Sequence, residues 1–257
     1  MKPTKLSSGE LMDMILRALD RQLPLAVVSL GASESFVLAQ ETVLPYREFM
    51  RHAEACVANM GLRRGQQHRG VRFPNLEARD VLAEALRRTN IIGYNLIIRD
   101  KHSGLLTEKV LDYYNLWPEY TFEAYIRRVI MFSQKEKFEN MLRGKRILLI
   151  CGYADEVKKA MNKNLQEKLG FTIAGTVKIH EYEDIPRAKK EIMAIDFDVA
   201  LLAAGLNAII LAVFIAERTG KVAFDIGQGM ESLITGEIQD AQGFISQAIG
   251  IVRLLDI

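Results

Sequence analysis

The sequence predicts an α/β fold with one mainly parallel, Rossmann-like sheet and helices on both faces. Three observations predict it. From residue 146 onward, short apolar runs alternate strictly with stretches of helical length. The apolar runs are nearly continuous, as in strands that are buried on both faces. Several of them end at a glycine, where a strand turns into the next helix. We therefore expect a single domain over residues 1–257, with a helical insertion at about 100–142.

The first half of the chain supplies helices and two strands. Residues 8–22 follow a capping serine, Ser7 or Ser8, and place apolar residues at helical spacing. The apolar run 25–30 predicts a buried strand. Pro45 favours a first helical turn, so we expect a helix from Pro45 to Asn59. The other elements expected here are helices at 33–40, 76–88 and 105–114, a strand at 91–98, a basic loop at 61–70 and a mostly helical segment at 120–142.

The second half predicts four strands and four helices. One stretch, 199–216, has 18 residues without a formal charge and so could also span a membrane. Gly205 and Asn207 interrupt it, which favours a buried strand, a turn and a buried helix. The strands are expected at 146–151, 171–177, 198–203 and 222–225, and the helices at 154–169, 186–195, 206–218 and 241–255.

The composition is that of a globular protein. The chain is 49% hydrophobic and 26% charged, and its net charge of +2 argues against a general nucleic-acid binder. The N-terminus has no apolar core and carries Glu10 and Asp13, so we expect no signal peptide and a cytoplasmic protein. Cys56 and Cys151 are expected to be buried, reduced thiols, although a pairing stays open.

Four glycines, Gly31, Gly152, Gly205 and Gly227, follow predicted strands. In a parallel sheet these turns share one edge, where ligands bind. Glycine lets a phosphate approach the backbone, and the following helix supplies N–H donors. Each glycine alone is explained by a tight turn, but the four together favour a nucleotide or phosphorylated ligand. No GxGxxG or GxxxxGK[ST] motif is present, which argues against a standard dinucleotide site and a P-loop.

Two acids stand at this edge. Glu34 lies in the first turn after Gly31, where it could bind a metal, accept a proton or simply complement the helix dipole. Asp225 ends a strand and could reach the ligand or cap its own turn, with the amide of Gln228 close behind. The basic loop over residues 63–72 could close as a diphosphate-binding lid or be a solvated surface loop. The histidines share no metal-ligand spacing, and no hydrolase motif is present.

Three stretches of the chain resemble one family. Residues 25–41 are similar to the opening strand, Arg-x-Gly-Asp-x-Glu pattern and helix of GT-D-type glycosyltransferases. The segments 142–152 and 198–228 resemble the family's later strands, which tend to end in Asp-x-Gly-His. Three positions depart from the pattern: Ser29 replaces the arginine, Ala32 the first acid and Gln228 the histidine. Glu34 retains the second acid, so the resemblance implies the fold and ligand class more firmly than the activity.

The resemblance implies a bacterial cytoplasmic enzyme that binds a nucleotide-sugar, typically UDP-glucose, with a divalent metal (Mn or Mg). It would transfer the sugar to a glycan or protein acceptor. A homo-oligomer stays open, and the composition and sequence pattern given above predict neither a nucleic-acid partner nor a membrane span. Glu34 would hold the metal, and Glu34 or Asp225 would activate the acceptor. The expected nucleotide-sugar-binding residues are Gly31, Ser33, Gly152, Gly205, Asn207 and Gln228.

Two alternatives stay open. The replacements at Ser29 and Ala32 favour a catalytically inactive binding or assembly module that partners a glycan-modifying enzyme. A methyl-transfer or nucleotide-dependent enzyme on the same sheet would use Gly152 as its cofactor turn. Binding experiments would distinguish the three. Metal-dependent binding of a UDP-sugar would support the glycosyltransferase, no nucleotide binding the module, and binding of an adenosyl cofactor the third hypothesis.

Overall fold

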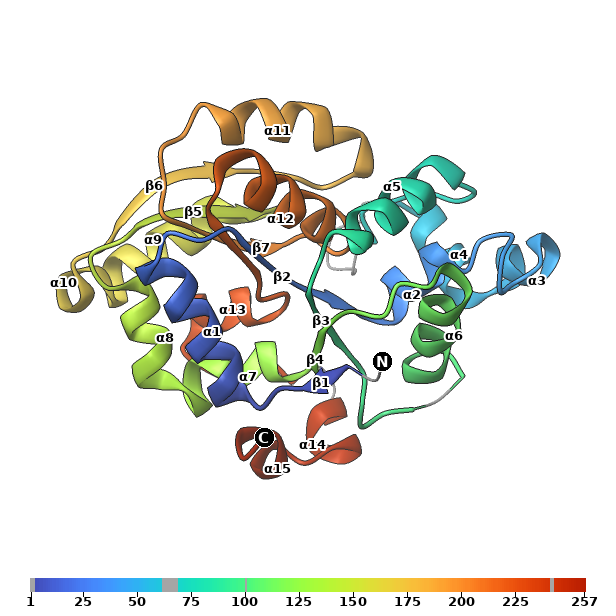
Figure 1. The fold of residues 1–257 in the computed structure, drawn as a ribbon, viewed down its shortest axis with the longest axis horizontal. Helices are drawn as coiled ribbons and strands as arrows, with labels where there is room; N and C mark the ends of the chain where they lie inside the picture. Colours follow the sequence, from blue (N-terminus) through green and yellow to red (C-terminus); the bar gives the residue numbers. More distant parts are fainter. Residues whose placement is uncertain (1–2, 62–68, 100, 241–242) are drawn as a thin grey trace.

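A computed structural model describes residues 3–61, 69–99, 101–240 and 243–257 (Figure 1). Eight strands form one sheet in which every recorded strand pair is parallel. The predicted fold class is therefore confirmed. In spatial order the strands are β1 (Thr4–Lys5), β4 (Tyr120–Glu123), β3 (Ile91–Tyr94), β2 (Leu25–Leu30), β8 (Val222–Asp225), β7 (Val199–Ala203), β5 (Arg146–Cys151) and β6 (Thr172–Val177).

The central strands are buried on both faces, which explains their continuous apolar sequence. Successive side chains of a strand point to opposite faces of the sheet. In β2, Val27 joins the core on one face and Val28 the core on the other, and both are fully buried. Leu148 and Leu149 of β5 divide in the same way. Each face therefore has its own hydrophobic core.

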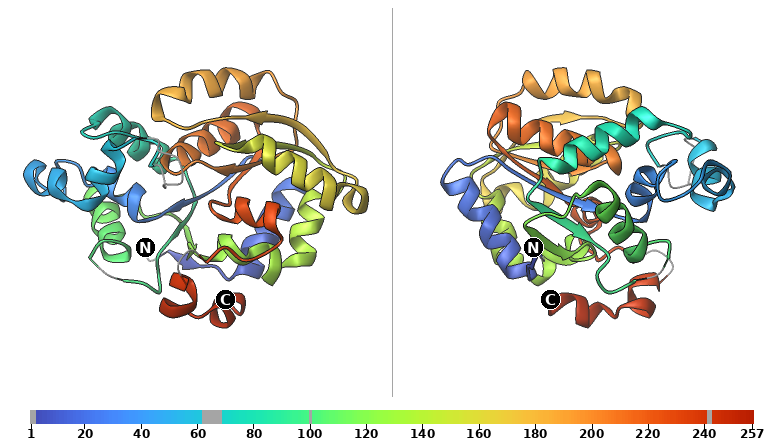
Figure 2. Two further views of the ribbon diagram at one scale, coloured as in Figure 1. Left: turned by 180° about the vertical axis from the view of Figure 1, so that it is seen from behind. Right: turned by 45° about the vertical axis from the view of Figure 1, so that its right-hand side comes forward.

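Helices cover both faces (Figures 1 and 2). On the Val28 face lie α2 (Ala32–Leu38), α3 (Tyr46–Arg51), α4 (Ala53–Asn59), α5 (Leu76–Arg87), α6 (Gly104–Tyr114), α11 (Ile185–Met193) and α12 (Leu206–Thr219). On the Val27 face lie α1 (Ser8–Asp20), α7 (Ile126–Ser133), α8 (Lys135–Leu142), α9 (Ala154–Asn164), α10 (Gln166–Leu169), α13 (Gly229–Thr235), α14 (Phe244–Ala248) and α15 (Ile251–Leu255).

Helix breaks are the commonest difference from the sequence prediction. The helix expected over 45–59 is two helices, because His52 adopts an extended backbone (φ −69°, ψ 145°) between α3 and α4. The helix expected over 154–169 is interrupted at Leu165. The C-terminal helix expected over 241–255 is also divided, with Gly250 before α15; residues 241–242 lie outside the described part.

The segment 100–142 differs from the expected helical insertion, because it contains a strand. Its last helices, α7 and α8, are as predicted, but Tyr120–Glu123 forms β4 between β1 and β3. Strand β1 was not predicted at all. Both strands are very short, so their residues carry little strand pattern on their own.

Residues 199–216 form β7, a turn and the buried helix α12, as the sequence favours. In the described part of the chain no helix is both long and apolar enough to span a membrane. The prediction for the two cysteines is half right. Both thiols are free, but only Cys151 is buried; Cys56 is exposed.

Candidate functional site

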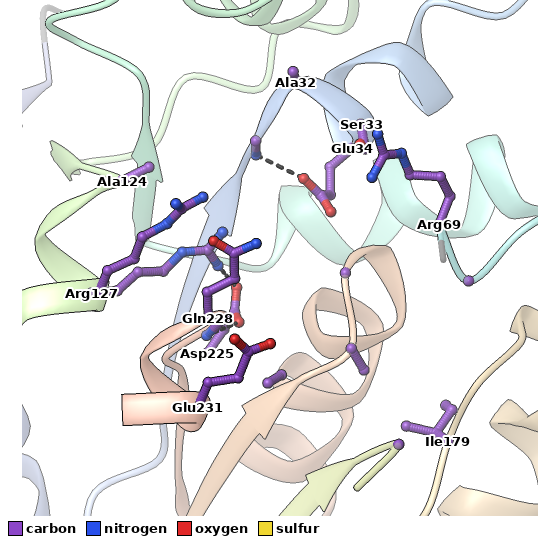
Figure 3. A pocket seen from close by; sticks show the side chains of 18 of the residues that line it. Ala32, Ser33, Glu34, Arg69, Ala124, Arg127, Ile179, Asp225, Gln228 and Glu231 are labelled. Atoms are coloured by element: carbon purple, nitrogen blue, oxygen red, sulfur yellow. Dashed lines mark hydrogen bonds and ion pairs between the residues drawn. The ribbon is translucent and has the colours of Figure 1, made fainter. Parts of the chain in front are cut away.

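A cavity of about 770 Å³ opens at the carboxyl ends of the parallel strands. The segments that follow β2, β3, β4, β5, β6, β7 and β8 all contribute to its wall. This is the edge where an open α/β sheet binds ligands, and the volume lies within the range of small-molecule sites. Figure 3 shows Glu34 and Asp225 on the same cavity, with Gln228 and Glu231 beside Asp225.

Most of the candidate residues predicted from the sequence meet in this cavity. Asn207 is the exception. It is 1% exposed, does not line the cavity, and donates its Nδ2 hydrogen to the carbonyl oxygen of Gly70 at 3.3 Å. Asn207 therefore lies beneath the cavity wall, where its hydrogen bond holds the backbone at Gly70. The candidates that line the cavity are Gly31, Ser33, Glu34, Gly152, Gly205, Asp225 and Gln228.

Glu34 is buried in the first turn of α2, where its Oε2 accepts the backbone N–H of Gly31 at 2.9 Å. Burial raises the pKa of this carboxyl, against the attraction of Arg127. The turn after β7 leaves room for it: Gly205 has φ +55° and ψ −135°, and a Cβ there would lie 3.3 Å from Glu34 Oε1. The site therefore holds a carboxylate whose charged form is disfavoured.

Asp225, at the end of β8, is paired with Arg127 from α7. Their side chains are 3% and 15% exposed. The other carboxylate oxygen of Asp225 accepts the N–H of Gly227 at 3.0 Å. Burial raises the pKa of Asp225, and the Arg127 charge opposes that rise. Gly227 has φ +50°, and a Cβ there would lie 2.8 Å from Arg127 Cζ, so glycine makes room for the guanidinium.

A second arginine, Arg128, lines the cavity beside Arg127. Its guanidinium carbon lies 4.7 Å from the ring centroid of Tyr125. Burial, followed by repulsion from Arg127, lowers the pKa of Arg128 to about 10. The sequence analysis missed both arginines, because they follow β4, which was itself predicted as helix. An Arg-Arg pair in the first turn of the helix that follows a strand was the signal that would have found them.

The buried carboxylate of Glu123 fixes the start of this arginine segment. It accepts the backbone N–H groups of Leu96 and Ile97, each at 2.8 Å, and of Tyr125 at 3.2 Å. Glu123 is fully buried, and burial raises its pKa despite these bonds. The loop after β3 and the first turn of α7 are thereby tied to one side chain.

The opposite rim is built on Glu54 of α4. Its carboxylate accepts two bonds from Arg69, from Nε at 2.8 Å and Nη2 at 3.0 Å, and one from Ser33 Oγ at 3.0 Å. Arg69 and Glu54 both line the cavity. Most of the basic loop predicted as a lid, residues 62–68, lies outside the described part of the chain, and the described Arg72 does not line the cavity.

The donor set does not make a metal centre. No group of three or more His, Cys, Asp or Glu side chains in the described ranges is arranged to hold a metal ion. Of the four acids that face the cavity, Glu34 bonds to Gly31, Asp225 to Arg127 and Glu54 to Arg69, while the carboxylate of Glu231 on α13 makes no hydrogen bond or ion pair with the described residues. Hard divalent cations need several oxygen ligands, and the described side chains alone do not gather three of them at one point.

Comparison with known proteins identifies a matching family model and similar solved structures. A family model described as a GT-D fold-like domain matches residues 6–233. A structure described as a new glycosyltransferase (DUF1792) from Streptococcus sanguinis is 13% identical, with a TM-score of 0.56 over 96% of this chain and 94% of that one. Another, described as the highly conserved domain of unknown function 1792 with a distinct glycosyltransferase fold, is 11% identical, with a TM-score of 0.57 over 93% and 84%. No curated protein matches the sequence. At these identities the structural likeness shows the fold alone.

Proposed function

We propose, from the premise that this chain belongs to the GT-D-like family, that it binds a nucleotide-diphosphate sugar in the strand-end cavity. A UDP-sugar is the donor that the resemblance implies. The protein would transfer the sugar to a hydroxyl group of a glycan or protein acceptor. The glycosyltransferase fold of its structural neighbours supports the reaction class, whereas the donor, the acceptor and the activity are our proposal.

One observation carries this proposal: Glu34 and Asp225, from opposite halves of the chain, line one cavity together with the strand-end glycines. Residues 31–34 offer a turn that a diphosphate can approach, with the Gly205 turn beside it. Gly152 and Gln228 lie on other parts of the same wall. The arrangement has the size, the concave shape and the convergent polar groups of a nucleotide-sugar site.

The carboxylates suggest how an acceptor would be activated. A buried carboxylate with a raised pKa is a better base than an exposed one, because it binds a proton more tightly. Glu34 meets this condition and has one oxygen, Oε1, beside Gly205. We propose Glu34 as the group that takes the acceptor's proton. Asp225 is the weaker candidate for that role, since it is already paired with Arg127. The divalent metal expected from the resemblance enters no step, because the donor set does not fit it.

A second function is favoured by the same contacts. Asp225 is neutralised by Arg127, and Glu34 is engaged with Gly31, so both candidate acids are held by the protein itself. A binding or assembly module that partners a glycan-modifying enzyme would have such a site. The cytoplasmic and bacterial setting and a homo-oligomer stay predictions that do not discriminate between the two functions.

Calorimetric titration with UDP-glucose and other nucleotide-sugars tests the proposal. Binding followed by slow release of free sugar supports the enzyme, because many transferases hydrolyse their donor when no acceptor is present. Binding without turnover on any glycan acceptor supports the module with a retained donor site. The absence of binding for every nucleotide-sugar would contradict the proposed ligand class.

A further inference from the structure

Among the described arginines of the cavity, Arg128 differs from the others in having no carboxylate partner. Arg69 is paired with Glu54, and Arg127 with Asp225. In the part of the chain that the structure describes, no acid lies within ion-pair distance of Arg128, and its recorded contact is the face of the Tyr125 ring. Glu231 and Asp240 attract it only from further away. Arg128 therefore brings an uncompensated positive charge to the cavity wall.

Leaving this charge uncompensated is unfavourable in the free protein. The side chain is half-buried, and the neighbouring Arg127 repels it. Burying a charge without a partner costs free energy, which an anion bound at the same place would recover. The cavity thus favours a ligand that carries negative charge beside Tyr125.

The position of Arg128 over the Tyr125 ring limits the kind of anion. When a guanidinium lies over an aromatic ring, its face is occupied, while the N–H groups around its edge stay free to donate hydrogen bonds. Two parallel N–H groups match two oxygens of a phosphate or carboxylate. The buried Glu123 holds the backbone at Tyr125, from which the ring projects, through the bond from the Tyr125 N–H to Glu123 Oε1 at 3.2 Å.

We infer that Arg128, stacked on Tyr125, binds the diphosphate of the sugar donor and supplies the positive charge there without a divalent cation. This inference rests on the proposed function and assigns its donor-binding residue. Arg127 contributes less to it, because Asp225 already offsets its charge. The acids of the cavity do not form a metal-binding cluster, whereas the arginine is present and unpaired.

The same residue would assist transfer. The acceptor oxygen forms a bond to the anomeric carbon of the sugar, and the bond from that carbon to the diphosphate oxygen breaks. The acceptor's proton passes to a cavity carboxylate, and the nucleoside diphosphate leaves with the electron pair of the broken bond. Negative charge therefore grows on the leaving oxygen, where hydrogen bonds from a fixed guanidinium strengthen.

Calorimetric titration of the full chain with UDP, ADP and GDP, each in EDTA and in Mn²⁺, tests the inference. We expect one of these diphosphates to bind in EDTA as well as in Mn²⁺. Arg128→Gln should weaken that binding about 10- to 100-fold, the range for a charge-assisted hydrogen bond. Binding of the matching nucleoside without phosphate should not change. Arg128→Lys should recover part of the affinity, because it restores the charge but not the planar pair of donors.

Two controls separate charge at this place from charge in general. Arg218→Gln, on an exposed residue at the far end of α12, should bind like the unmodified protein. Glu231→Gln removes a negative charge from the same wall and should strengthen diphosphate binding slightly. Circular dichroism should show that Arg128→Gln is folded.

The outcomes distinguish this inference from the proposed function. If a diphosphate binds only when Mn²⁺ is added, binding without a divalent cation is wrong. If it binds Arg128→Gln as tightly as the unmodified protein, the arginine assignment is wrong. In both cases the nucleotide site stands. If none of the diphosphates and no nucleotide-sugar binds under either condition, both the site and the assignment are wrong.

Discussion

Asp225 and Arg127 form an ion pair that joins two segments 98 residues apart at the centre of the cavity wall. Asp225 is the last residue of β8, which pairs with β2 in the sheet. Arg127 lies in α7, the helix that follows β4 along the chain. Gly227 leaves the space that the guanidinium occupies. This pair fixes where α7 meets the sheet edge and therefore where the neighbouring Arg128 projects.

Arg127→Gln should destabilise the protein by about 3 kcal/mol at pH 7, because it leaves the buried Asp225 carboxylate without its partner. Urea unfolding measures the loss. Acid should reduce this loss. Burial already raises the pKa of Asp225, and removing Arg127 raises it further, so the carboxylate of the variant takes up its proton at higher pH than that of the unmodified protein. A loss that does not shrink on acidification would contradict the role of the unpaired charge.

Gly227→Ala should disturb the same pair without removing either charge. A Cβ at residue 227 would lie 2.8 Å from Arg127 Cζ, so the guanidinium has to move. The matched control is Gly236→Ala at the other end of α13, where φ is +74° and no atom lies within 4 Å of the added Cβ. Both variants carry the strain of positive φ, about 1 kcal/mol. Thermal unfolding should show an additional loss only for Gly227→Ala.

The central strands of the sheet could be predicted from the sequence, for a physical reason. Strands such as Leu25–Leu30 and Arg146–Cys151 are buried on both faces, so nearly every residue in them is apolar. The edge strand β1 and its neighbour β4 have two and four residues, and they are held by pairing with partners distant in sequence. No local pattern reports such pairing, and β4 was consequently predicted as helix.

The site could be predicted only in part, for a related reason. Glycines and acids that directly follow a strand are brought to the sheet edge by topology alone, as Glu34 and Asp225 are. Arg127 and Arg128 reach the cavity only because β4 joins the sheet. Asn207, by contrast, follows a strand-end glycine but turns toward Gly70, a contact that no spacing in the sequence indicates.

Glu34→Gln should abolish sugar transfer if Glu34 accepts the acceptor's proton, and it should stabilise the folded protein at neutral pH. Burial raises the pKa of Glu34 above its ordinary value of 4.5. The unfolded chain therefore loses this proton at lower pH than the folded chain, so stability falls as pH rises through that window. Glutamine avoids this loss and can still accept the N–H of Gly31.

The melting temperature measured from pH 4 to pH 8 tests the stability half of this prediction. The difference between Glu34→Gln and the unmodified protein should be small at the acidic end and grow as the pH rises. Glu237→Gln, on an exposed acid, is the control and should show no such trend. A variant that is less stable at pH 8 than at pH 4, relative to the unmodified protein, would show that the Glu34 charge is stabilised by the fold.

His52 should produce a pH dependence of opposite sign. Its Nδ1 accepts the N–H of Glu54 at the start of α4, and its Nε2 lies 3.0 Å from His102 Nδ1. Burial, followed by His102, lowers the pKa of His52 below its ordinary value of 6.5. The unfolded chain thus takes up the proton first as the pH falls, and the folded state loses stability below about pH 6.5. Protonation at Nδ1 would also remove the acceptor that caps α4.

His52→Asn keeps a capping oxygen at this position but has no titrating group. We therefore expect the unmodified protein to lose melting temperature between pH 7 and pH 5 more steeply than the variant. Because Glu54 binds both Ser33 and Arg69, the same acidification should loosen the rim of the cavity that α4 supports. Hydrogen exchange at the N–H of Glu54, expressed as protection after correction for the intrinsic change of the exchange rate with pH, measures that step directly. Equal protection at both pH values would rule out the loosening.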